Sequence, residues 1–253
     1  MFGKFRDTAF AAAATVAFVS AASLPFAAHA AEVLRIGAPL ALTGGLADEG
    51  KKQEAVWQLW LDKVNAAGGI KVGDKTMKVE LVKYDYQTDG KRAGQLAEKL
   101  VTDDKVDVLM APFGSGHTKI VAAVAERYQV PLLACVASSE SVYDQSFKYL
   151  FGTLAPNSGM TDAMAALFKE KLPSLKKVAI YGRDDVFPKA MATSLATSAK
   201  AAGLEVVYNE LYAVGTMDHS AAMAAIHRLD GVVAASLVYH HFESLADSAA
   251  VPV

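Results

Sequence analysis

Segments typical of strands and segments typical of helices alternate along most of this chain, and this alternation restricts the folds open to it. Apolar runs such as 33–40 and 177–182 have the length of buried strands. Between them, apolar residues recur every three or four positions, as in 93–100. Such alternation is typical of a mostly parallel sheet covered by helices. The sequence therefore predicts an α/β fold.

The expected elements follow from the same patterns. We expect strands at 33–40, 77–84, 106–111, 131–137, 177–182, 204–211 and 232–239. Helices are expected after residues 50, 89 and 118, and over 159–171, 188–203 and 221–228. Asp89 can cap the second helix, and Val56, Trp60 and Val64 have the spacing of one face of the first. Residues 149–154 are interpreted as a crossover to a second series of elements.

The loop 111–118, APFGSGHT, leads from an expected strand directly into an expected helix. In open parallel α/β sheets, ligands bind beside the carboxyl ends of the strands. Gly114 allows the backbone to approach a ligand closely, and Ser115 offers a hydroxyl and an N–H group. The positive end of the helix dipole adds to them. This combination suits a carboxylate, although a plain helix cap would have the same sequence.

Two further loops also follow expected strands. In 136–141, Ser138 can face a carboxylate and the Val136 carbonyl can accept from an ammonium, unless this segment is only a serine-rich helix cap. In 182–188, Phe187 could form an apolar wall over a ligand, although a single aromatic side chain can equally belong to the core. Both loops are candidate ligand contacts.

The sequence lacks the motifs of the common enzyme classes. Phe113 stands where a G-x-S-x-G nucleophile elbow around Ser115 would need glycine. There is no G-x-x-x-x-G-K-[ST] loop, and the histidines do not have the spacing of metal ligands. We therefore expect no enzyme activity, no cofactor and no metal. A secreted hydrolase that uses Ser115 with His117 is the alternative, but side chains two residues apart would rarely point together.

Residues 1–30 have the features of a secretory signal peptide. Lys4 and Arg6 precede the apolar run 9–19, and residues 28–30, Ala-His-Ala, have the small-x-small pattern that a signal peptidase cuts. The apolar run is too short to span a membrane. We therefore expect an exported protein with a cleaved leader and no transmembrane anchor.

Charge and cysteine content exclude other classes. The net charge is −2 and no basic run is present, so nucleic acid and anionic membranes are poor candidate partners. The single cysteine, Cys135, cannot form an internal disulfide. It lies in the apolar run 131–137, where we expect a buried and inert thiol.

Several segments, in this order, resemble the branched-chain amino acid binding proteins of ABC transporters, which are type I periplasmic binding proteins of the leucine-binding-protein kind. The segments are IGAPLALTGG, NAAGGI, KVELVKYDYQTD, APFGSGHT, VPLLACVASSE and VAIYGRDDVFPKA. The resemblance implies a two-lobed α/β receptor with parallel sheets flanked by helices. It implies capture of an amino acid or similar small carboxylate, and delivery to an ABC permease in the inner membrane.

The resemblance also implies roles for particular residues. Ser115 and Ser138 match the residues that hold the ligand α-carboxylate in this family, and the Val136 carbonyl matches the acceptor for its ammonium. Phe187 matches an aromatic residue that packs on the ligand. Glu49 stands where some members have a tyrosine, which favours a polar ligand or a side chain that faces solvent.

The resemblance further implies a leader at 1–30, a first lobe at 31–153 and a partial second lobe at 154–253. We expect a monomer that is truncated at its C-terminus, with an atypical tail from about residue 228. The acid that pairs with the ligand ammonium in relatives would lie beyond Val253, so we expect weak or absent ligand binding. The alternatives are a frameshifted, non-binding fragment and the sensor ectodomain of a receptor.

Overall fold

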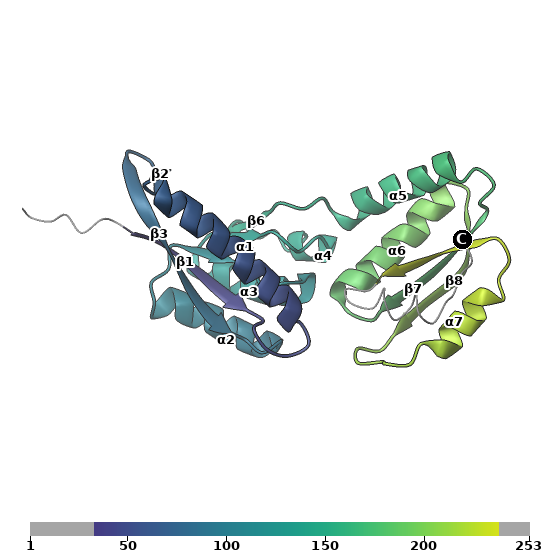
Figure 1. The fold of residues 1–253 in the computed structure, drawn as a ribbon, viewed down its shortest axis with the longest axis horizontal. Coiled ribbons are helices and arrows are strands. Elements are labelled where there is room, and N and C mark those ends of the chain that lie inside the picture. Colours follow the sequence, from purple (N-terminus) through teal and green to yellow (C-terminus); the bar gives the residue numbers. More distant parts are fainter. Residues whose placement is uncertain (1–32, 238–253) are drawn as a thin grey trace, which may run out of the picture. The chain divides into compact units, whose positions relative to one another are not determined.

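The computed structural model describes residues 33–237, which form an α/β fold with two separate sheets (Figure 1). The first sheet contains β1 (Val33–Leu40), β2 (Ile70–Val72), β3 (Lys75–Asp85), β4 (Val108–Met110), β5 (Leu132–Ala134) and β6 (Leu150–Gly152). The second contains β7 (Lys177–Arg183), β8 (Glu205–Tyr212) and β9 (Val232–Leu237). The predicted leader at 1–30 and the tail beyond 237 lie outside the described residues.

Helices connect most of these strands. They are α1 (Ala47–Ala66), α2 (Gly90–Thr102), α3 (Ser115–Tyr128), α4 (Glu140–Tyr143), α5 (Asn157–Lys171), α6 (Val186–Ala201) and α7 (Ser220–His227). The first sheet has the order β2-β3-β1-β4-β5-β6 and the second has the order β8-β7-β9. Pairing is parallel except between β2 and β3, which form an antiparallel hairpin around Gly73. The predicted α/β class with mostly parallel sheets is confirmed.

Helices cover both faces of the first sheet. On one face, α2 and α3 bury a large core that includes Leu100, Leu109 and Leu132. On the other face, α1 packs Leu61 against Ile36 of β1. Asp89 caps α2 as predicted, since its carboxylate accepts a hydrogen bond from the Arg92 N–H at 2.9 Å.

The second sheet has a core of its own. Val178 and Ile180 of β7 are fully buried against Leu195 of α6, with partly buried residues of α5 beside them. The helices α5 and α6 lie side by side along the sheet (Figure 1). Among the described helices, none is both long enough and apolar enough to cross a membrane.

The apolar spacing in α1 does not mark the buried face of the helix. Val56 and Trp60 are 63% and 41% exposed, whereas Gly50, Gln53 and Leu61 of the same helix are buried. The helix packs through small and polar residues in its first two turns, because its N-terminal part lies directly against the end of β1. A search for large apolar residues cannot detect that face.

The interpretation of 149–154 as a crossover is also wrong. Residues 150–152 form β6, which pairs in parallel with β5 of the first sheet, with Leu150 opposite Leu132. The strand is three residues long and follows a helix of four residues. Elements this short contain too few residues to show a period.

Candidate functional site

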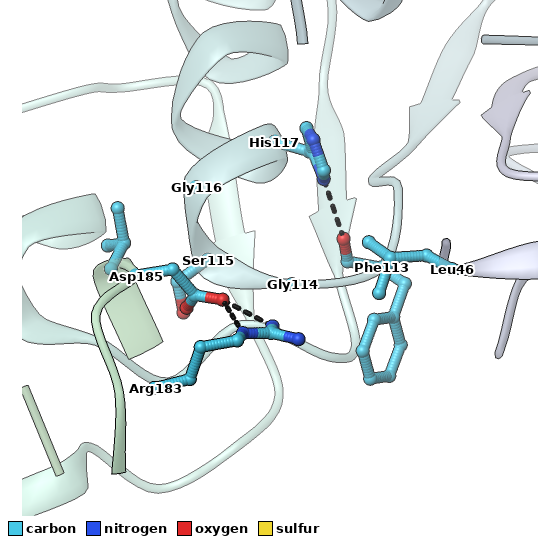
Figure 2. Close-up of a pocket in the computed structure, with 9 residues that line it drawn as sticks. Leu46, Phe113, Gly114, Ser115, Gly116, His117, Arg183 and Asp185 are labelled. Carbon is cyan, nitrogen blue, oxygen red and sulfur yellow. Dashed lines mark hydrogen bonds and ion pairs between the residues drawn. The ribbon is translucent and has the colours of Figure 1, made fainter. Parts of the chain in front are cut away.

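Loops that follow β1, β4 and β7 surround a cavity of about 140 Å³ (Figure 2). Its lining residues are Leu46, Phe113, Gly114, Ser115, Gly116, His117, Arg183, Asp185 and Val186. Each of these residues lies at the carboxyl end of a strand, in the loop that follows it, or in the first turn of the next helix. This is where ligands bind in open parallel α/β sheets.

Asp85, at the end of β3, holds the loop that carries Leu46 to the cavity. Its carboxylate accepts hydrogen bonds from the Leu42 N–H at 3.0 Å, the Thr43 N–H at 3.3 Å and the Thr43 hydroxyl at 2.6 Å. The Thr88 hydroxyl also holds this loop, because it accepts a hydrogen bond from the Leu46 N–H at 3.1 Å. Leu46 is therefore positioned by two polar side chains of the neighbouring strand end.

We expect the Asp85 interactions to make stability depend on acid pH. Burial raises the pKa of Asp85, but the hydrogen bonds from Thr43, Gln87 and Leu42 outweigh this effect and hold the pKa below its ordinary value. The folded pKa is thus lower than the unfolded value of about 3.9. The stabilisation is present above that value and is lost as the pH falls through the folded pKa.

The variant Asp85→Asn tests this expectation. At pH 7 it should be less stable than the parent by about 1–3 kcal/mol in urea unfolding, because hydrogen bonds to a charged acceptor are replaced. Its stability should also change less between about pH 5 and pH 3. Asp74→Asn, in the exposed β2–β3 turn, is the matched control. Equal acid sensitivity of the parent and Asp85→Asn would contradict the assignment.

The two serine-bearing turns after β4 and β5 contact each other. The Ser115 hydroxyl accepts a hydrogen bond from the Ser139 N–H at 3.2 Å, and the Gly114 N–H donates to the Val136 carbonyl at 3.3 Å. Gly114 has φ = +89°, a conformation that favours glycine and turns the chain into α3. Ser115 is 1% exposed and begins the helix. Gly114 and Ser115 both line the cavity.

Ser138 lies deeper than the sequence suggests. Its hydroxyl donates to the Asn157 side-chain carbonyl at 2.7 Å, and its own carbonyl accepts from the Asn157 N–H at 3.0 Å. Among the described lining residues of the cavity, neither Ser138 nor Val136 occurs. Ser138 therefore joins the turn after β5 to the start of α5, and its contact with a ligand stays a prediction.

The other two predicted ligand residues, Phe187 and Glu49, are not among the described lining residues of the cavity. Val186, the first residue of α6, lines it, and Phe187 is the next residue of the same helix. Glu49 is in the first turn of α1, where its carboxylate forms an ion pair with Lys52 at 2.8 Å. Their roles toward a ligand also stay predictions.

Of the nine lining residues, the sequence predicted only Gly114 and Ser115 as ligand contacts. The seven that it did not predict are Leu46, Phe113, Gly116, His117, Arg183, Asp185 and Val186. Asp185 occupies the N-cap position of α6, and its carboxylate accepts a hydrogen bond from the Arg183 Nε at 2.6 Å and also contacts Nη2 (Figure 2). The position of these residues after a strand was the signal that could have identified them.

His117 lines the cavity as a neutral ring at neutral pH. Its Nδ1 lies 3.4 Å from the Phe113 carbonyl oxygen and 3.4 Å from the Tyr86 hydroxyl. Burial lowers the pKa of His117 below its usual value of about 6.5, against smaller opposing effects of the Phe113 carbonyl and Asp185. Within the described residues, the Ser115 and His117 side chains form no hydrogen bond with each other, as a nucleophile and its base would. In residues 33–237 no cluster of His, Cys, Asp and Glu could hold a metal ion.

Comparison with known families agrees with this geometry. The sequence profile of the family described as periplasmic binding protein matches residues 33–238. The chain belongs to this family. Its fold, with parallel sheets flanked by helices and a cavity at the strand ends, is the type I periplasmic binding protein fold.

Several members of the periplasmic binding protein family are similar to this chain. The Leu/Ile/Val-binding protein homolog 8 of Brucella suis is 30% identical over 209 residues, which are 80% of this chain and 50% of the relative. The leucine-, isoleucine-, valine-, threonine- and alanine-binding protein of Pseudomonas aeruginosa is 24% identical, over 83% and 56% of the two chains. This chain thus spans about half the length of these curated relatives.

Solved structures show the same fold. The crystal structure of the branched-chain amino acid transporter substrate-binding protein LivJ from Streptococcus pneumoniae, in complex with isoleucine, superposes with a TM-score of 0.71. The two proteins are 29% identical, and the match covers 80% of this chain and 57% of LivJ. A solute-binding protein of Rhodopseudomonas palustris, in complex with 4-hydroxybenzoate, gives a TM-score of 0.69 at 23% identity, over 81% and 54% of the two chains.

Proposed function

We propose that this chain is a periplasmic solute-binding protein that captures a small carboxylate, an amino acid or a related acid, for an ABC transporter. The observation that carries the proposal is the convergence of three strand-end loops on the N-terminus of α3 in one cavity. The names of the similar proteins, which describe binding of leucine, isoleucine and valine, support the ligand class.

The first turn of α3 is the carboxylate-binding element in this proposal. The N–H groups of the first turn have no partner within the helix, and the dipole of the 14-residue helix places partial positive charge there. Ser115 and Gly116 carry two of these N–H groups, and both residues line the cavity. An anion at this position is held without any change in covalent bonds, so the activity is capture and not catalysis.

A bound ligand would favour the closed arrangement of the protein. We take residues 31–153 and 154–253 as the two lobes, with the ligand touching loops of both. A ligand that contacts both sets of loops stabilises the conformation in which they meet it, by its differential affinity for that state. A permease of the inner membrane would then recognise the loaded, monomeric protein. Export by the predicted leader would bring the chain to the periplasm.

Substitutions at Gly116 test the site without touching the core. A methyl group at Gly116 would lie 3.4 Å from Val186 Cγ2, which is an ordinary contact, so Gly116→Ala should bind nearly as well as the parent. Gly116→Leu should fill the cavity and weaken binding by about tenfold or more. Neither change should destabilise the fold, because both replace glycine in a helix.

The measurement is isothermal titration calorimetry against a panel of amino acids and simple carboxylates, with thermal unfolding as a second readout. Ligand that binds only the folded chain raises its melting temperature. Absence of any heat or thermal shift for the parent chain would refute the proposal and favour the non-binding fragment. Hydrolysis of an ester that is lost in Ser115→Ala would favour the hydrolase instead.

A further inference from the structure

The cavity contains one ion pair, and its geometry affects which carboxylates fit. Arg183, at the end of β7, contacts the Asp185 carboxylate through both Nε and Nη2. The two side chains are only 20% and 31% exposed, so water screens the pair less than it would screen a surface pair. Among the lining residues that the structure describes, Asp185 carries the only carboxylate.

An amino acid needs an acceptor for its ammonium group in such a cavity. An ammonium that loses its hydration without a hydrogen-bonded counter-ion is strongly disfavoured. Asp185 is already neutralised by Arg183, and the His117 ring adds no negative charge. A ligand carboxylate is favoured instead, because the N-terminus of α3 carries partial positive charge toward the cavity and no unpaired carboxylate among the described lining residues repels it.

The remaining surface of the cavity is apolar. It is formed by the side chains of Leu46, Phe113 and Val186, with glycines at 114 and 116 between them. The volume of about 140 Å³ is close to the roughly 150 Å³ of an engineered protein cavity that admits benzene. The cavity thus has room for one six-membered ring or one branched alkyl chain.

We propose that this cavity selects a small apolar or aromatic carboxylate without an amino group, and that the Arg183–Asp185 ion pair is the element that excludes amino acids. This inference rests on the proposed capture of carboxylates at the start of α3 and narrows the ligand class. Arg183 acts here as a specificity-determining residue, because its charge cancels that of Asp185 and the pair offers an ammonium no net negative charge.

Matched ligand pairs test this on the full chain. L-leucine and 4-methylpentanoate share a carbon skeleton and differ by the amino group, as do L-phenylglycine and phenylacetate. In titration calorimetry, 4-methylpentanoate and phenylacetate should bind about tenfold or more tightly than their amino counterparts. Tighter binding of the amino acids would overturn the inference and leave the proposed capture of carboxylates intact. Absence of binding by all four would refute the proposed function itself.

Substitution of the ion pair tests the role of Arg183. Arg183→Met should expose the Asp185 carboxylate and shift the preference toward L-leucine by about tenfold. Adding Asp185→Asn to this variant should restore the preference for 4-methylpentanoate. Lys189→Met is the matched control, because it removes the Lys189–Asp184 pair, which is outside this cavity. An unchanged preference in Arg183→Met, with the fold retained, would contradict the assigned role.

Discussion

Replacing Gly50 by alanine should destabilise the protein by about 3 kcal/mol or more. A methyl carbon at Gly50 would lie 2.6 Å from the carbonyl carbon of Ala41 and closer still to its oxygen. Both atoms belong to the backbone just beyond β1, so no side-chain rotation can relieve the overlap. The helix α1 must therefore move away from the sheet, or the chain after β1 must shift.

The effect of Gly50→Ala should also reach the cavity. The segment that starts at Ala41 continues to Leu46, so a shift there displaces one wall of the site. Urea unfolding and ligand titration should both report the change. Gly159→Ala is the matched control, since Gly159 is exposed in α5 and a methyl group there would meet no atom within 4 Å. That control should be stabilised by up to about 1 kcal/mol, and similar losses in both variants would refute the explanation.

The second large effect is expected from Leu109→Ala, with a loss of about 3 kcal/mol. Leu109 is fully buried in β4, in the core formed with α2 and α3. Its Cδ2 lies near Gly37 of the adjacent strand, where no side chain could move in to fill the space. The truncated side chain should therefore leave a cavity, and the midpoint of urea unfolding should fall accordingly.

Leu59→Ala is the matched control for this truncation. Leu59 is 57% exposed on α1, so the same chemical change removes little buried surface there. Its effect should stay within about 0.5 kcal/mol. A loss at Leu59 as large as that at Leu109 would contradict the explanation by core burial, because alanine is the better helix former.

The longer elements were predictable from the sequence because their patterns extend over several turns or alternations. The strand Val33–Leu40 has the predicted bounds, and Asp89 is the predicted cap. Failures occurred where the pattern was short or was carried by small residues. The strands Ile70–Val72 and Leu150–Gly152 have three residues each, and the buried face of α1 depends on Gly50 and Gln53.

The site was predictable only as far as the backbone determines it. The rule that ligands bind at strand ends identified the loop with Gly114 and Ser115, and both residues line the cavity. The same rule does not say which side chains of a loop turn inward. Arg183 and Asp185 were missed because their ion pair depends on how the chain turns from β7 into α6. The sequence pattern does not predict the geometry of that turn.

The short strand β6 has a consequence for how copies of this protein behave when concentrated. Within the described residues it is the outermost strand of its sheet, and it exposes Phe151 beside unpaired backbone groups. An exposed strand at the edge of a sheet can pair with a strand of another molecule, and long, flat edges do so most readily. Here the strand ends at Gly152, and Pro156, which has no N–H to donate, follows shortly after. Because β6 is only three residues long, it offers few backbone groups for pairing, and this limits self-association along that edge.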